Sequence, residues 1–238
     1  MANQLPYDAH MIPTELTANI TEVNQRIRAA EALAGRKSGS VSLLAVSKTK
    51  PAEAIRRAHC EGLTKFGENY AQEMAEKSQI LADLPLTWHF IGPIQSNKTA
   101  LIAKVSDWVH SIDRIKIARR LNEHRPAEKA PLNVLIQVNT SNEDTKAGVT
   151  PEALPELAAE ITELPRLSLR GLMTIPAPAS TPEQQRAPFR QLRDLMSALQ
   201  PSYPDLDTLS MGMSGDLESA IAEGATIVRI GTDLFGAR

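Results

Sequence analysis

The feature that most constrains the fold of this 238-residue chain is a repeated alternation of short apolar runs with segments of helical periodicity. Each run has the length and β-branched content of a buried strand, and the segment after it repeats apolar residues every three or four positions. The eight strand-like runs cover residues 43–48, a short run ending in 66–70, then 87–92, 108–113, 132–139, 170–175, 209–213 and 226–232.

Eight strand-and-helix alternations in one chain predict a closed parallel barrel of the α/β class, the (β/α)8 TIM barrel. We expect the barrel proper over about 41–238 and an additional N-terminal helix over about 14–34. No linker of domain size interrupts the pattern, so we predict a single domain over residues 1–238. A doubly wound sheet is the alternative, but no G-x-G-x-x-G motif follows the first strand.

Composition excludes several classes of partner. A formal net charge of −2 gives no electrostatic case for nucleic acid or an anionic membrane. No apolar run approaches the ~18 residues that span a bilayer, and the N-terminus lacks the basic and apolar regions of a secretory signal. Cys60 is the only cysteine, which excludes an internal disulfide and favours a reducing, cytoplasmic location. The five histidines lack the spacing of a metal site, so we expect no metal.

The first strand carries the most informative lysine. The stretch LLAVSKTKP predicts a strand that ends near Lys48 or Thr49, with Leu44, Val46 and Lys48 on one face. An amine at the end of an apolar row is desolvated, which lowers its pKa and lets it attack a carbonyl to form a Schiff base. The alternative is a strand-end lysine that simply reaches water.

The last two strands predict a phosphate site, because barrels often bind phosphate in the loops after strands seven and eight. Strand seven leads into Ser214, which can cap a helix starting there and offer its hydroxyl. Strand eight leads into Gly231 and Thr232, where glycine permits close approach of backbone N–H groups to an anion. Ordinary capping by Ser214 and a turn at Gly231 are the alternatives.

Other strand ends supply further candidates. Arg229 shares a face with Gly231, so an inward guanidinium there needs a partner, for which a salt bridge to Glu68 is the alternative to a ligand. Asn69 ends strand two beside Lys48 and can hydrogen-bond a hydroxyl on the ring of a ligand or cap a helix. Met173 and His89 end strands six and three, where a core methionine and a satisfied structural histidine are the ordinary roles.

Together these stretches resemble the pyridoxal phosphate homeostasis family (YggS/PROSC-like proteins). The similarity runs in order from the first helix to Arg238, which makes chance a poor explanation. The stretches that carry it are LLAVSKTKP, FGENYAQE, WHFIGPIQSNK, DRIKIARRLN, LRGLMTIPAP, LSMGMSGDLESAIAEGATIVRIGT and FGAR.

The resemblance implies a fold-type III barrel, like that of alanine racemases and bacterial-type ornithine decarboxylases, with pyridoxal 5'-phosphate (PLP) as cofactor. It implies that Lys48 holds PLP as an internal aldimine and that Arg229 lies near the pyridine nitrogen. The remaining implied cofactor contacts are the phosphate cradle of Ser214, Gly231 and Thr232, with Asn69 and Met173 beside the ring.

The resemblance also implies a carrier or buffer of PLP, whose further partners are amino acids and apo forms of PLP enzymes. An arginine at the pyridine nitrogen disfavours the pyridinium and so weakens the ring as an electron sink. We see no opposing catalytic base among Tyr7, Tyr70 and Tyr203, and no stretch left for a second domain. An amino-acid racemase is the main alternative, and a cofactor-free Schiff-base aldolase is a third. We expect a monomer, because no site needs a second chain.

Overall fold

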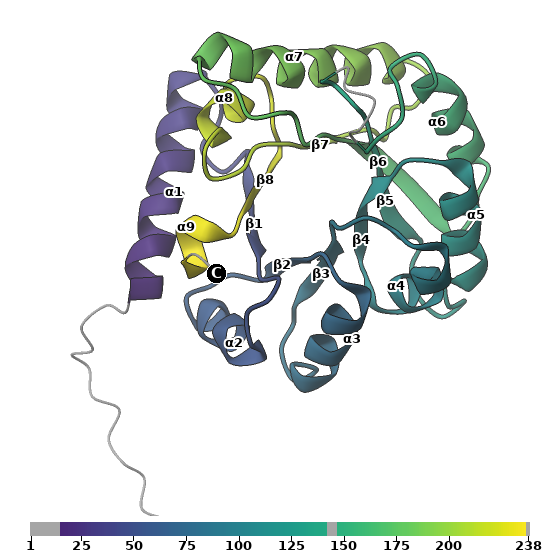
Figure 1. Cartoon of the computed structure of the whole chain (residues 1–238), viewed down its shortest axis with the longest axis horizontal. Helices are drawn as coiled ribbons and strands as arrows, with labels where there is room; N and C mark the ends of the chain where they lie inside the picture. The colour runs from purple at the N-terminus through teal and green to yellow at the C-terminus, as the bar shows by residue number, and fades with distance from the viewer. Residues whose placement is uncertain (1–14, 142–146, 237–238) are drawn as a thin grey trace, which may run out of the picture.

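The computed structural model describes residues 15–141 and 147–236. Within them, eight parallel strands form a closed barrel in which each strand pairs with the next and β8 returns to β1 (Figure 1). The strands are β1 (Ser42–Val46), β2 (Lys65–Glu68), β3 (Thr87–Phe90), β4 (Trp108–Ile112), β5 (Leu132–Gln137), β6 (Leu167–Met173), β7 (Thr208–Ser210) and β8 (Ile227–Ile230). The predicted (β/α)8 fold is therefore confirmed.

Helices alternate with the strands and surround the barrel (Figure 1). They are α1 (Glu15–Leu33), α2 (Ala52–Cys60), α3 (Ala71–Ile80), the 3-10 turn η1 (Ser96–Lys98), α4 (Thr99–Val105), α5 (Ile115–His124), α6 (Leu154–Thr162), α7 (Pro182–Leu199), α8 (Leu217–Ala222) and α9 (Thr232–Phe235). The additional N-terminal helix is α1, which buries Ile20, Val23 and Ile27 and lies against α8 and α9. Tyr7, His10 and the final two residues of FGAR lie outside the described residues, so the single-domain prediction over 1–238 stays a prediction.

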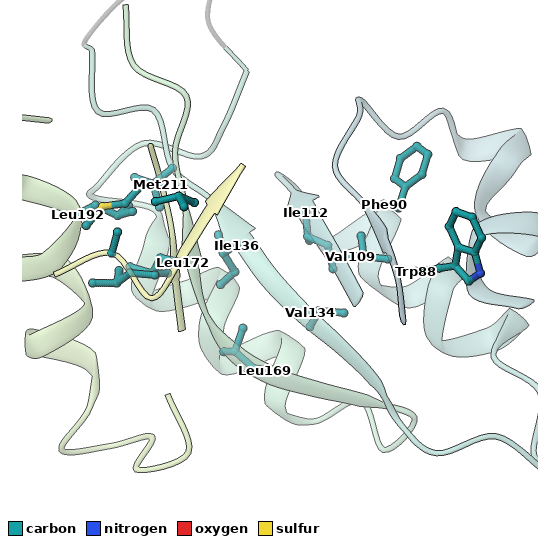
Figure 2. Packing of buried hydrophobic residues seen from close by; sticks show 14 of the residues in the cluster. Trp88, Phe90, Val109, Ile112, Val134, Ile136, Leu169, Leu172, Leu192 and Met211 are labelled. Atoms are coloured by element: carbon teal, nitrogen blue, oxygen red, sulfur yellow. The ribbon is translucent and has the colours of Figure 1, made fainter. Parts of the chain in front are cut away.

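Most of the apolar core lies between the strands and the helices (Figure 2). Alternation along β3 sends Trp88 and Phe90 into this layer, so the intervening His89 faces the barrel interior. In β6 the layer includes both Leu169 and Leu172, three residues apart, because a register shift between β5 and β6 inserts an extra residue at that point. Burial of this layer is what closes the barrel.

The barrel interior is mixed in character. Leu44, Val46, Ile91 and Ile227 form a small apolar cluster, separate from the outer layer. The remaining interior positions include buried polar groups, namely His89, His110, Ser210 and Arg229. Burial of such groups is unfavourable unless they are hydrogen-bonded, so their partners need to be identified.

Several predicted boundaries were wrong by a few residues. β1 ends at Val46, because the amide of Lys50 donates to the Ser47 carbonyl (3.0 Å) and closes a turn there. Lys48 therefore lies in this turn and not in the strand. β6 begins at Leu167 and ends at Met173, and β8 ends at Ile230, so that Thr232 begins α9.

Local hydrogen bonds set where three of the helices begin. Helix α6 begins at Leu154, since the Ala153 amide donates to the Thr150 carbonyl (3.2 Å) and makes a preceding turn. The helix expected from Ser214 begins at Leu217, so Ser214 is not its cap. Helix α7 is capped by Thr181, whose hydroxyl accepts from the Gln184 amide (3.3 Å), with Pro182 as the first helical residue.

No helix within the described residues is long and apolar enough to cross a membrane. No group of three His, Cys, Asp or Glu side chains within residues 15–141 and 147–236 could hold a metal ion.

Candidate functional site

A cavity of about 250 Å3 opens at the carboxyl ends of the strands, the face where barrels of this class carry their sites. Six of the seven predicted site residues line it, although they come from four separate loops or strands. The lining residues are Val46, Lys48, Asn69, Ile91, Ile175, Met213, Ser214, Gly215, Arg229, Gly231 and Thr232.

Met173 is the predicted site residue that does not line the cavity. It is fully buried at the end of β6, where it pairs with Gln137 and Ser210 of the neighbouring strands. Ile175, two residues further along, is 40% exposed and lines the cavity instead. β6 ends at Met173, two residues earlier than predicted. Met173 therefore lies within the barrel, and Ile175 reaches the mouth.

The turn that carries Lys48 is held by hydrogen bonds to side chains that end β2 or lie on α3. The Ser47 carbonyl accepts from Nζ of Lys77 (2.7 Å), and the Ser47 hydroxyl donates to Oε1 of Glu68 (2.6 Å). On the other side of Lys48, the Thr49 amide donates to Oε1 of Glu73 (2.6 Å). Both residues that flank the half-buried Lys48 are thus fixed, and the lysine has little freedom at its backbone.

Glu68, Glu73 and Lys77 form one group, which we call the ionic cluster. Lys77 Nζ bonds Oε1 of both Glu68 and Glu73 at 2.7 Å, and Glu68 is fully buried. Burial raises the pKa of Glu68, and the bonds from Lys77 and Ser47 partly oppose this. Its second oxygen, Oε2, has no hydrogen-bond partner within the described chain. The predicted alternative, a salt bridge from Arg229 to Glu68, is therefore wrong, because Lys77 fills that role.

Arg229 lies under the cavity with its guanidinium bonded to neutral acceptors. Nη1 donates to the Ser210 hydroxyl (2.8 Å) and Nη2 to the Thr174 carbonyl (2.9 Å). Burial lowers the pKa of Arg229 to about 10, an effect that the charge of Asp216 partly offsets. The group therefore stays protonated at neutral pH.

Ser210 continues into two buried histidines, and we call His89, His110 and Ser210 the histidine relay. Ser210 Oγ lies 2.9 Å from Nδ1 of His110, and Nε2 of His110 lies 2.9 Å from Nδ1 of His89. His89 also stacks on Trp108, with ring centroids 5.6 Å apart. His89 was expected to be a satisfied structural histidine, but its Nε2 is buried without a partner in the described residues.

The relay is uncharged. Burial lowers the pKa of His89 to about 3, with a smaller effect from the charge of Lys65. Burial, then the nearby His89 and Arg229, hold the pKa of His110 well below its usual value. Because the Ser210 hydroxyl oxygen accepts from Arg229, the hydroxyl proton is free to be donated to Nδ1 of His110. Nε2 of His110 then carries a proton and donates it to Nδ1 of His89. The relay thus orients the acceptor that holds Arg229.

Asn69 forms one wall of the cavity, directly after β2. Its Oδ1 is buried and has no hydrogen-bond partner in the described chain. A Cβ on Gly92 would lie 2.1 Å from the Asn69 carbonyl oxygen, so only glycine lets the two loops approach this closely. The Asn69 backbone is therefore packed against Gly92, and the side-chain Oδ1 has hydrogen-bonding capacity left for a ligand.

The opposite end of the cavity is lined by Ser214, Gly215, Gly231 and Thr232. Within the described residues, the hydroxyls of Ser214 and Thr232 make no hydrogen bond. The loop before α8 is closed by Asp216, whose Oδ1 accepts from the Met213 amide (2.6 Å), so Ser214 is not needed for capping. Hydroxyls and closely approaching glycine backbone are the groups that bind phosphate oxygens.

Sequence reasoning missed five lining residues: Val46, Ile91, Ile175, Met213 and Gly215. Some signal was present, because Ile175 shares a face with Met173 and Gly215 follows Ser214 in the predicted phosphate loop. Ile91 and Val46 belong to the apolar interior cluster, whose extension into the cavity depends on where each strand ends. They give part of the cavity lining an apolar surface.

The fold and the matched family model place this chain in the class of barrels related to the N-terminal domain of alanine racemase. The family model "Alanine racemase, N-terminal domain" matches residues 18–238. An alanine racemase from Clostridium difficile superposes with a TM-score of 0.75 at 16% identity, over 94% of this chain and 57% of that one, and shares the barrel.

Closer relatives identify the family within that class. The pyridoxal phosphate homeostasis protein of Pseudomonas aeruginosa is 60% identical over 94% of this chain and 96% of its own length. That of Escherichia coli is 52% identical over 94% and 97%. PipY of Synechococcus elongatus, solved with PLP bound, has a TM-score of 0.78 at 38% identity, over 90% of this chain and 100% of that one. This chain belongs to the pyridoxal phosphate homeostasis protein family, which confirms the resemblance found in the sequence.

Proposed function

We propose that this protein binds PLP as a Schiff base on Lys48 and acts in PLP homeostasis, as a carrier or buffer of the cofactor. The observation that carries the proposal is the cavity itself. It places an amine, an unsatisfied amide, a buried guanidinium and two unbonded hydroxyls around one space of about 250 Å3. The relative PipY, at 38% identity, has been solved with PLP bound.

The residues fit this cofactor at each end. Lys48 would hold PLP through a C=N bond between its Nζ and the aldehyde carbon, formed with loss of one water. The hydroxyls of Ser214 and Thr232, with the backbone at Gly231, would hold the phosphate, and the Asn69 amide would hold the ring hydroxyl. Arg229 would face the pyridine nitrogen as a hydrogen-bond donor. When bound, the cofactor supplies an electrophilic carbon and a conjugated ring that can delocalise charge.

We propose that the protein has no enzymatic turnover of its own. Arg229 keeps its proton at neutral pH and so leaves the pyridine nitrogen unprotonated, which limits carbanion chemistry. Among the described lining residues, Lys48 and Arg229 are the only ionisable side chains, and none is left to act as a second base. Tyr70 is 54% exposed and does not line the cavity.

Location, assembly and exchange partners follow as parts of the same proposal. An exposed, unpaired Cys60 suits a reducing cytoplasm. All the proposed ligands come from one chain, which suits a monomer. The open mouth allows amino acids and apo forms of PLP enzymes to take up the cofactor.

The test is reduction of the PLP complex with borohydride, followed by absorbance and peptide mapping. The adduct should map to Lys48, and Lys48→Ala should lose both the adduct and the visible band. Lys50→Ala is the matched control, because Lys50 is two residues away and its Nζ bonds the Phe235 carbonyl (2.8 Å). An adduct mainly on Lys50 or Lys98 would overturn the assignment.

A second measurement separates the carrier from a racemase. Deuterium incorporation at Cα of L- and D-amino acids should be slow, without racemisation at enzyme-like rates, while PLP passes to an apo-enzyme. Rapid exchange with racemisation would reject the carrier and favour the racemase. A protein that shows no PLP-dependent visible band would favour the cofactor-free aldolase.

A further inference from the structure

Helix α1 is not one of the helices that alternate with the barrel strands, yet it lies across α8 and α9, where the last two barrel loops end (Figure 1). These two loops carry Ser214 and Thr232, the residues at the proposed phosphate end of the cavity. The position of α1 raises the question of whether it does more than cover the barrel wall.

Arg26 of α1 contacts both loops with one guanidinium. Its Nη2 donates to the Ser214 carbonyl (2.9 Å), and its Nη1 donates to Oδ2 of Asp233 (2.7 Å), next to Thr232. Its Nε and Nη2 also donate to the two oxygens of Glu218 at the start of α8 (2.8 and 3.1 Å). The planar fork of arginine is suited to such bridging, since its donors are fixed relative to one another.

The bond to Ser214 fixes the direction of a backbone donor. In a trans peptide the carbonyl and the following N–H point in opposite directions. Because the Ser214 carbonyl points toward Arg26 on α1, the amide of Gly215 points away from α1, and Gly215 lines the cavity. Arg26 thus aims one peptide N–H at the phosphate end.

The bond to Asp233 pairs a negative charge that lies next to Thr232 in the chain. Asp233 does not line the cavity, but it follows Thr232 directly, so an unpaired carboxylate at this position would add negative charge next to the proposed phosphate end and disfavour the ligand. Arg26 offsets this charge and holds the carboxylate on the α1 side. The hydrogen bond to Glu218, more than any other contact, raises the pKa of Arg26, so the guanidinium keeps its charge.

A second set of contacts ties α9 to the rest of the site. Asn19 of α1 donates from Nδ2 to the Leu234 carbonyl (3.1 Å). Lys50, in the turn that carries Lys48, donates from Nζ to the Phe235 carbonyl (2.8 Å). The short helix α9 therefore links α1 to the turn of the proposed Schiff-base lysine.

We propose that Arg26 is a positioning residue that joins the two halves of the phosphate site, so that α1 sets how tightly a phosphate-bearing ligand is held. This inference rests on the proposed function, because it concerns the phosphate end of the PLP site. Arg26 itself need not touch the ligand: it acts through the Ser214–Gly215 peptide and through the Asp233 carboxylate.

The test compares PLP with pyridoxal, which has the same aldehyde and ring but no phosphate. Arg26→Gln should weaken PLP binding by about tenfold, the effect of one altered charge near a protein surface, and speed PLP release to the same extent. Pyridoxal affinity should change little. Inorganic phosphate should compete with PLP on the wild type, and its inhibition constant in that competition should be higher on the variant.

Arg28→Gln is the matched control. Arg28 lies on the same helix and bonds Glu31 of that helix (2.7 Å), without contact to either loop, so its loss should leave the PLP-to-pyridoxal ratio unchanged. Should Arg26→Gln fold poorly, Arg26→Lys keeps the charge but cannot bridge both loops, and should lower the ratio by a smaller factor. Adding Asp233→Asn to Arg26→Gln should recover part of the PLP affinity.

The outcomes separate this inference from the proposed function. If the wild type forms no Schiff base with PLP, the proposed function fails. If the wild type binds PLP but Arg26→Gln lowers PLP and pyridoxal affinity equally, or neither, the positioning role of Arg26 is wrong and the PLP site stands.

Discussion

The ionic cluster and the histidine relay both support the cavity from below, but they do so with different chemistry. The turn of Lys48 rests on the buried Glu68 and Lys77 and the half-buried Glu73, a group with three formal charges. Arg229 rests on Ser210 and the two histidines behind it, a group with none. In the ionic cluster, charged side chains fix an uncharged backbone turn. In the histidine relay, neutral side chains fix a charged guanidinium.

The difference shows how each cluster should respond to damage. A buried ion pair is costly to break, because the remaining charge is left without its partner. A neutral relay is less costly to interrupt, but it is sensitive to protonation, since its histidines must stay uncharged. Four predictions test this comparison.

The largest effect is expected for Lys77→Met, which leaves the buried Glu68 carboxylate without a cation. We expect the free energy of unfolding at pH 7 to fall by about 3–5 kcal/mol. Denaturant unfolding measures this, and Lys77→Met with Glu68→Leu should recover much of the loss. Arg119→Met, which breaks the exposed pair with Glu160, is the control and should cost little. Equal losses for Lys77→Met and Arg119→Met would show that the ionic cluster contributes no more than a surface pair.

The next effect is a stability loss in acid caused by the histidine relay. The folded pKa of His89 is about 3, below its unfolded value, and that of His110 is also lowered. Below about pH 6.5 the unfolded chain therefore takes up protons that the folded chain does not. As the pH is lowered, the free energy of unfolding should decrease by up to about 1.4 kcal/mol per pH unit for each histidine.

Glu68 acts in the opposite direction in the same experiment, because its raised pKa makes the folded state bind a proton more readily as pH falls. Comparing variants removes this contribution. His89→Gln and His110→Gln should each remove about half of the acid-dependent slope between about pH 6.5 and 5. Imidazole NMR signals assigned to His89 or His110 that titrate near pH 6.5 in the folded protein would contradict the neutral relay.

A smaller effect is expected for Ser210→Ala, which removes one acceptor of Arg229 and the partner of His110. Loss of this buried hydroxyl should lower the free energy of unfolding by about 1–3 kcal/mol and weaken PLP binding through Arg229. Ser106→Ala is the control, since that buried hydroxyl has, among the described residues, a single hydrogen bond, to the sulfur of Met74 at 3.6 Å. Unchanged PLP affinity in a destabilised Ser210→Ala would show that the relay serves the fold alone.

The smallest effect concerns the strained residue beside the ionic cluster. Thr49 has φ of 64°, in the left-handed region that β-branched residues rarely adopt. Thr49→Asn keeps the backbone amide that donates to Glu73. Because asparagine tolerates the left-handed region better, the variant should be more stable by roughly 0.5–1 kcal/mol. Thr49→Val retains the branching and should give no gain in the same unfolding measurement.

The sequence alone determined the barrel and the general location of the site. Eight strand-like runs with helices between them leave few parallel folds, and each site candidate was placed at the end of a run. In a parallel barrel all strand ends of one kind meet at one face. Lys48, Asn69, Ser214, Arg229, Gly231 and Thr232 therefore had to lie near one another once the strands were recognised.

What only the tertiary structure decided is which side chains hold these residues in place. His110 and Ser210 are 100 positions apart, and Arg26 and Ser214 are 188 apart, yet both pairs are hydrogen-bonded. Such contacts depend on barrel closure and on where each strand ends, and no local pattern encodes either. The same cause placed Met173 inside the barrel and Ile175 at the cavity, because a difference of two residues in the end of β6 changes which side chain reaches the mouth.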